Sequence, residues 1–183
     1  MPVVNLKELD RSERLIIPFK GLKDGWHEFF FMLSQKFFQS LDYSEFEKGE
    51  LSVKVKMDKK PSHLVLKIEI EGKVNVMCDR CLEYFDFASK YSGTLYVKFS
   101  NEPTNDEEND ELMVIPENEH EVDISHYVYE SISLSLPFQR YHPVNKKGIS
   151  SCNKEMISKL KELEIKKQGL DNRWEKLKEI NSN

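Results

Sequence analysis

A two-residue alternation of apolar and polar side chains through the middle of the chain constrains the fold most strongly. Residues 51–57 carry apolar side chains at odd positions, residues 64–70 at even positions, and residues 85–99 mostly at odd positions. Successive side chains of a β-strand point to opposite faces, so this period predicts strands with one buried face and one face in water. We therefore predict an α+β fold built on an antiparallel β-meander, with closure into a barrel as an alternative. The side chains that we expect to be buried include Leu66, Ile68, Phe87, Leu95 and Val97.

Shorter elements are predicted around the meander. Residues 14–19 read as a short strand that ends near Pro18, and the aromatic run in residues 26–33 is typical of a buried strand. Residues 34–41 favour a short helix, and residues 112–115 favour a brief strand.

Helices are predicted in the last third of the chain. Apolar residues three and four apart follow Asp123, which can cap a helix that Pro137 limits. Asn153 and Asp171 can cap two further helices, so that residues 153–180 form a helical tail.

The charges are unevenly distributed along the chain. Residues 101–123 hold ten Asp or Glu and no Lys or Arg, whereas residues 138–183 hold eleven basic and six acidic residues. Residues 101–111 have no apolar side chain that could offset the entropy of ordering, so we expect a disordered acidic loop that is dispensable for folding. We expect the rest of residues 1–183 to form a single domain. The basic C-terminal quarter leaves room for a local nucleic-acid contact.

Two classes of protein are disfavoured by what the sequence lacks. The first residues do not have the basic, apolar and small-residue order of a signal peptide, and no apolar run reaches the roughly 18–20 residues that span a bilayer. We therefore expect a cytoplasmic protein with no membrane contact. Glycine-rich phosphate loops, G-x-S-x-G and H-E-x-x-H are absent as well, so we expect no enzymatic activity.

A pair of cysteines is the feature with the clearest chemistry. Cys78 and Cys81 are separated by two residues between predicted strands, which is half of a tetrahedral zinc site. His142 and Cys152, in one loop between two predicted helices, could supply the remaining ligands. We predict that these four side chains come together, with zinc as the candidate cofactor. Packed thiols without metal and a thiol redox centre are the alternatives, although the redox centre would favour a pair that opens a helix.

Several segments together resemble one known family. They are VMCDRCLEYFDF, then EVDISHYVYESISLSLPFQRYHP followed by CN, the opening IIPFKGLKDGWHEFFF and the closing DNRWEKLKEI. This combination resembles the YceD family of large ribosomal RNA subunit accumulation proteins. The resemblance implies a paired Cys at Cys78 and Cys81, and a His and a Cys after the L-S-L-P segment, which His142 and Cys152 match. Asn172 departs from the proline that the resemblance would place there, which affects the start of the last helix.

The resemblance also implies a function. Members are small cytoplasmic α+β proteins without attached enzymatic activity, linked to accumulation of large-subunit ribosomal RNA and hence to ribosome assembly. The expected partner is ribosomal RNA or a large-subunit precursor particle. An alternative is a protein-interaction module whose acidic loop recruits a basic ribosomal protein. The candidate RNA contacts are Arg80, Arg140, Lys146, Lys147 and Arg173.

Overall fold

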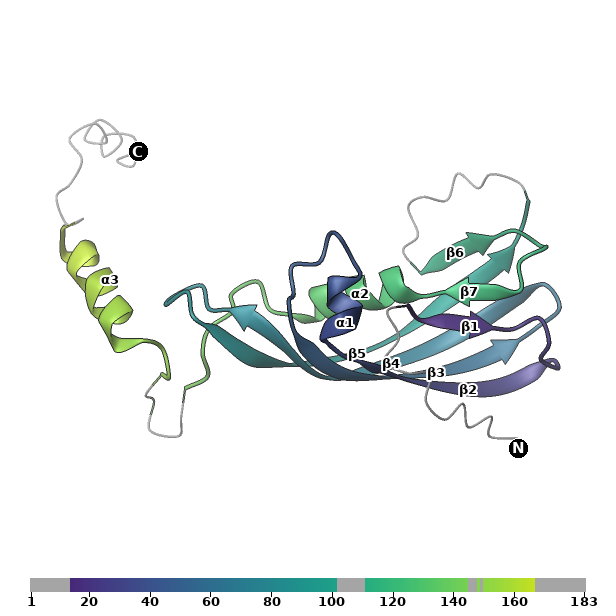
Figure 1. Ribbon diagram of the computed structural model, residues 1–183, viewed down its shortest axis with the longest axis horizontal. Helices are drawn as coiled ribbons and strands as arrows, with labels where there is room; N and C mark the ends of the chain where they lie inside the picture. Colours follow the sequence, from purple (N-terminus) through teal and green to yellow (C-terminus); the bar gives the residue numbers. More distant parts are fainter. Residues whose placement is uncertain (1–13, 102–110, 145–147, 149, 167–183) are drawn as a thin grey trace, which may run out of the picture. The chain divides into compact units, whose positions relative to one another are not determined.

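The computed structural model describes residues 14–101, 111–144, 148 and 150–166, with an α+β architecture (Figure 1). In chain order the elements are β1 (Ile16–Pro18), β2 (Gly25–Leu33), α1 (Gln35–Gln39), β3 (Gly49–Lys59), β4 (His63–Met77), β5 (Tyr84–Phe99), β6 (Leu112–Ile115), β7 (Glu121–Asp123), α2 (Ser125–Ser135) and α3 (Lys154–Lys166).

The chain divides into two compact units. We call the first the sheet unit; it comprises residues up to Val76 together with Asp86–Phe138. The second, the cysteine unit, comprises Met77–Phe85 and the residues from Gln139 onward. That residues 1–183 form a single domain stays a prediction.

The sheet unit contains a five-stranded sheet in the order β2-β3-β4-β5-β6. Its antiparallel register aligns Phe29 with Val55 and Val55 with Ile68, all of which are buried. The three alternating runs therefore combine into one apolar face. The predicted barrel alternative is wrong because the sheet is open, and β6 runs parallel to β5 at one edge. Alternation specifies which face of a strand is buried but not the direction of its neighbour.

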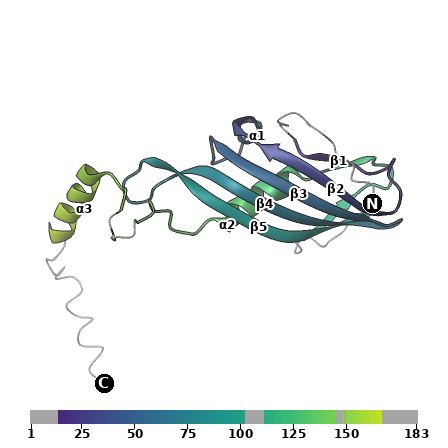
Figure 2. The same cartoon turned by 90° about the horizontal axis from the view of Figure 1, so that it is seen from below.

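A layer of short elements covers one face of this sheet. Helices α1 and α2 lie on that side together with the β1·β7 ribbon (Figures 1 and 2). Val128 and Ile132 of α2 are fully buried, and hydroxyl contacts join α2 to β5, with Tyr127 Oη 2.9 Å from Tyr91 Oη. The hydrophobic core therefore lies between the sheet and this layer.

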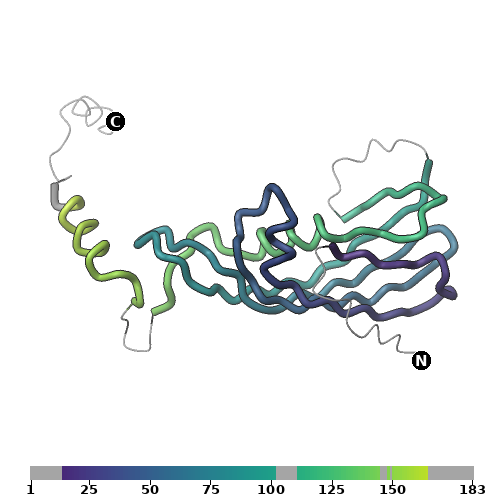
Figure 3. Tube along the Cα trace, in the orientation of Figure 1, coloured from purple at the N-terminus to yellow at the C-terminus, as the bar shows by residue number. Residues whose placement is uncertain are grey.

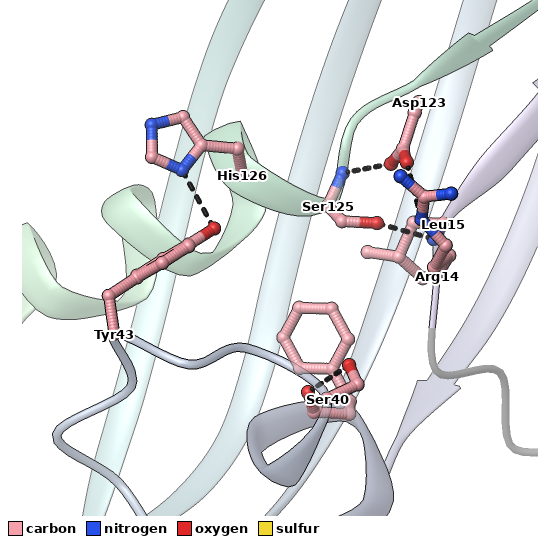
Figure 4. Close-up of polar contacts among 8 residues, drawn as sticks. Arg14, Leu15, Ser40, Tyr43, Asp123, Ser125 and His126 are labelled. Atoms are coloured by element: carbon pink, nitrogen blue, oxygen red, sulfur yellow. Dashed lines mark hydrogen bonds and ion pairs between the residues drawn. The ribbon is translucent and has the colours of Figure 1, made fainter.

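Strands β1 and β7 are neighbours although the rest of the sheet unit's chain separates them, as the trace in Figure 3 shows. The backbone N–H of Leu15 donates to the Ser125 Oγ at 2.7 Å, and this bond is buried (Figure 4). The Asp123 carboxylate accepts from the Ser125 N–H at 2.9 Å and pairs with Arg14 at 3.1 Å. The prediction that Asp123 caps α2 is wrong by one position, because the N-cap is Ile124, which makes no side-chain cap, and Asp123 holds the first N–H of the helix from the position before it. Strand β7 was not predicted because Val122 is the only apolar residue of its three.

Two burial predictions need correction. Strand β2 is not buried on both faces, because its outward side chains Trp26, Phe30 and Met32 are at least half exposed. Among the described residues, elements cover one side of the sheet, so an aromatic run in an edge strand is buried at alternate positions. Phe87 is half-buried, whereas the other four predicted core residues are buried.

Several predicted elements match the structure at their start. Asn153 precedes α3, and α1 follows Ser34, which makes no side-chain cap. The acidic loop predicted at 101–111 and the helix predicted after Asp171 fall largely outside the described residues.

In the described part of the chain, no helix combines the length and the apolar character needed to cross a bilayer.

Candidate metal centre

The cysteine unit brings together the four side chains that the sequence nominated as ligands. The Sγ atoms of Cys78, Cys81 and Cys152 and a ring nitrogen of His142 all lie within 4.8 Å of one another. The three cysteines are free thiols and are buried, and His142 is half-buried. These residues come from two segments that are far apart in the sequence, so the convergence is a property of the tertiary structure.

The first pair of ligands is presented by a tight turn between β4 and β5. The Cys78 N–H donates to the Glu83 carbonyl at 3.0 Å, and the Leu82 N–H donates to the Cys78 carbonyl at 2.9 Å. Leu82 adopts a φ of 62°, in the left-handed region that costs a non-glycine residue about 1 kcal/mol. This turn directs the Cys78 and Cys81 side chains inward, where their exposure is 0% and 2%.

His142 is positioned by a clamp, which we define as the two hydrogen bonds between Asp79 and Arg140. The Asp79 N–H donates to the Arg140 carbonyl at 2.9 Å, and the Asp79 carboxylate accepts from the Arg140 N–H at 2.6 Å. The segment that carries His142 is therefore held along the cysteine turn. The imidazole ring also stacks on Phe85, with centroids 4.5 Å apart.

Cys152 is positioned by the start of α3. The Asn153 Oδ1 accepts from the backbone N–H groups of Glu155 and Met156, which caps the helix. The other end of the same amide, Nδ2, donates to the Glu83 carboxylate at 2.7 Å. One side chain thus ties α3 to the cysteine turn and places Cys152 beside it.

The spacing of the ligand atoms fits a tetrahedral ion. Sulfur at about 2.3 Å and nitrogen at about 2.0 Å from a tetrahedral zinc lie roughly 3.5–3.8 Å from one another. Here Cys78 Sγ is 3.8 Å from Cys152 Sγ, and His142 Nδ1 is 3.4 Å from Cys81 Sγ and 3.7 Å from Cys152 Sγ. The cluster can therefore accept a metal ion without rearrangement of its backbone.

The thiols have different electrostatic surroundings. Burial raises the pKa of Cys78, but hydrogen bonds from the backbone of Cys81, Arg80 and His142 and from the His142 ring outweigh it and lower the pKa to about 6. Burial, with the neighbouring Cys78 and Cys81, raises the pKa of Cys152. Converging N–H groups that stabilise a thiolate are the surroundings that favour sulfur as a metal ligand.

Apolar side chains close the site around the ligands. Phe85, Tyr141, Met156 and Ile157, all partly buried, pack against the three cysteines. A Cys₃His set enclosed in this way leaves no open coordination position, which is the arrangement of a structural rather than a catalytic zinc site.

Two of the predicted RNA contacts lie beside the centre. Arg80 is at the tip of the cysteine turn, 4.6 Å from the centroid of the Tyr141 ring, and Arg140 is in the clamped segment. Lys146, Lys147 and Arg173 lie outside the described residues, so the predicted five-cation patch stays a prediction.

Sequence reasoning missed the residues that hold the ligands in place. No sequence pattern marks Asp79 or Phe85 for this role, and none connects Asn153 with Glu83. The Asp79 carboxylate between the two cysteines is a weak signal of this clamp. Its partner Arg140 lies 61 positions away, so the sequence does not indicate which residue it contacts.

Comparison with known proteins places the chain in a family. No curated protein and no solved structure matched it. Residues 66–181 match the family model described as large ribosomal RNA subunit accumulation protein YceD, and this range includes all four candidate ligands. Because the match covers well over half of the chain, the protein belongs to the YceD family.

Proposed function

We propose that this protein is a non-catalytic factor that supports large-subunit ribosomal RNA accumulation and ribosome assembly by contacting ribosomal RNA or a large-subunit precursor particle. The family description supports the general role. The single observation that supports a direct contact is the closed Cys₃His cluster, which fixes the Arg80 turn and the Arg140 segment against each other. A cytoplasmic location and the lack of an enzymatic activity are parts of the same proposal.

Zinc is the ion that we propose for the cluster. Thiolate and imidazole ligands in tetrahedral arrangement favour zinc over magnesium or calcium, which take oxygen ligands. Cys78, Cys81, His142 and Cys152 would hold it. In this role the ion would supply no chemistry beyond joining the two segments of the cysteine unit.

The joined segments can present cations to a phosphate backbone. The guanidinium of Arg80 is placed over Tyr141, so its freedom is reduced before a ligand arrives. Each phosphate that a Lys or Arg neutralises releases counterions, so binding should weaken as salt rises. Lys146, Lys147 and Arg173 are proposed to add to this contact.

A second candidate function is the recruitment of a basic ribosomal protein by the acidic segment 101–111. The charge of that segment supports it, because residues 101–111 hold six acidic and no basic residues. It differs from the first candidate in requiring no contact between the cysteine unit and RNA.

Gradient sedimentation of ribosomes from cells lacking the protein tests the proposal. We expect a deficit of large subunits that the native chain restores and that the double variant R80A/R140A restores poorly. The control is K90A/K98A, which removes two exposed lysines of the sheet unit. Normal subunit ratios in the deleted strain would contradict the family-derived role. Full rescue by R80A/R140A would contradict the direct contact.

A further inference from the structure

The sheet unit contains a cavity of about 410 Å³ with an unusual lining. It is bounded by β5, by α2 and by the residue that precedes β6. Its lining contains three tyrosines, two glutamates, two serines and one leucine. The residues that define its chemistry are Tyr91, Glu111, Tyr127, Tyr129, Glu130 and Leu134. No Lys, Arg or His lines the cavity among the residues that the structure describes.

The aromatic walls of this tyrosine pocket are held in place by hydrogen bonds. The hydroxyl oxygens of Tyr91 and Tyr127 are 2.9 Å apart, and the two rings are edge-on to each other with centroids 6.4 Å apart. Burial and the neighbouring Tyr91 raise the pKa of Tyr127, so the Tyr127 phenol stays neutral at physiological pH. The Tyr129 hydroxyl accepts from the Glu45 N–H and donates to the Tyr43 carbonyl. The rings therefore need little further ordering to receive a ligand.

The carboxylate of Glu130 is oriented as well. It lies 3.0 Å from His126 Nε2, and Nδ1 of the same imidazole lies 2.9 Å from the Tyr43 hydroxyl (Figure 4). A neutral His126 that carries its proton on Nε2 satisfies both contacts, donating to Glu130 and accepting from Tyr43. Both glutamates of the lining are exposed at the cavity, so negative charge faces an entering group.

Leu134 contributes an apolar surface at the same site. It follows Glu130 by one helical turn on α2 and is 81% exposed. A large aliphatic side chain that is this exposed at the rim of a cavity can pack against the methylene groups of a ligand.

We propose that the tyrosine pocket binds an arginine side chain of a basic protein segment. Guanidinium groups stack on aromatic rings and pair with carboxylates, and their stems pack on aliphatic surface. The pocket offers all three kinds of contact, and none of the described residues that line it is a Lys, Arg or His that would repel the ligand. The five acidic residues of 111–123, a stretch without Lys or Arg, add a field that attracts a cationic partner and repels nucleic acid phosphates.

This inference goes beyond the proposed RNA contact and does not rest on it. The RNA contact is assigned to Arg80 and Arg140 in the cysteine unit, whereas the pocket belongs to the sheet unit. Each can fail while the other holds.

Fluorescence anisotropy of a labelled peptide tests the pocket. The probe is a twelve-residue peptide of alternating Arg and Ser, titrated with the full chain. The control peptide carries citrulline, which keeps the shape of arginine without its charge, in place of every Arg. We expect the citrulline peptide to bind at least about ten-fold more weakly, because a charge-assisted contact is lost at each occupied site.

Variants of the chain distinguish the pocket from general attraction. E130Q should weaken binding of the Arg peptide about five-fold, and L134S should weaken it about two-fold. E119Q removes the same charge from an exposed residue outside the pocket and should change binding by less than two-fold. Melting temperatures of the three variants should stay close to that of the native chain, since all three residues are exposed.

Several outcomes would overturn the proposal. Equal losses from E130Q and E119Q would assign binding to the overall negative charge, and equal binding of the citrulline peptide would remove the role of the cation. Failure of the Arg peptide to bind at low salt would show that the pocket does not select a basic protein segment.

Discussion

Removal of metal should unfold the cysteine unit while leaving the sheet unit intact. The cysteine unit has a small apolar core, in which Phe85, Tyr141, Met156 and Ile157 are only partly buried around three cysteines. At about 1 kcal/mol for each half-buried side chain, these four contribute roughly 4 kcal/mol. A structural zinc contributes about 10–16 kcal/mol. The metal should therefore be the main source of stability in this unit.

Hydrogen exchange read by mass spectrometry measures this directly. After chelation, or in C152S, peptides from residues 150–166 should lose protection by a factor of about 10³ or more, since each 1.4 kcal/mol is worth ten-fold. Peptides from β3 and β4, whose inward side chains are fully buried, should be unchanged. S158A, at an exposed position of α3, is the matched control for C152S.

The reasoning would be refuted if residues 150–166 were equally protected with and without metal. That result would mean that the apolar contacts and the Asn153 and Asp79 hydrogen bonds hold the cysteine unit together unaided. Elemental analysis of protein purified without chelators should accompany the experiment, with about one equivalent of zinc expected.

Two further predictions concern stability and are read from urea or thermal unfolding. Ser125→Ala should cost about 1–3 kcal/mol, because the buried N–H of Leu15 loses its acceptor; a cost near zero would mean that water replaces the hydroxyl. Gly72→Ala should cost about 2 kcal/mol or more, because its Cβ would lie 2.2 Å from a backbone oxygen of β3, whereas Gly21→Ala meets nothing within 4 Å and should be nearly neutral.

The strands could be predicted from the sequence because their signal is local. Strands β3, β4 and β5 alternate in a phase that can be read without their neighbours, and Leu66, Ile68, Leu95 and Val97 are buried as that phase requires. The same pattern could not show that β6 is parallel to β5 or that β2 has an uncovered face. Both depend on which element lies next to the strand, and side-chain alternation carries no information on that.

For the candidate metal centre, the sequence by itself determined the ligand chemistry. A C-x-x-C pair between strands, with a His and a third Cys in a later loop, specifies the donors of a tetrahedral site. Whether those donors could meet was decided by the tertiary structure, through the Asp79 clamp on Arg140 and the bridge from Asn153 to Glu83. These bonds join residues 61 and 70 positions apart, and short polar side chains of this kind are common in turns and caps with no such role. The tyrosine pocket was likewise invisible in the sequence, because its walls come from a strand and a helix whose facing surfaces are set only when the layers pack.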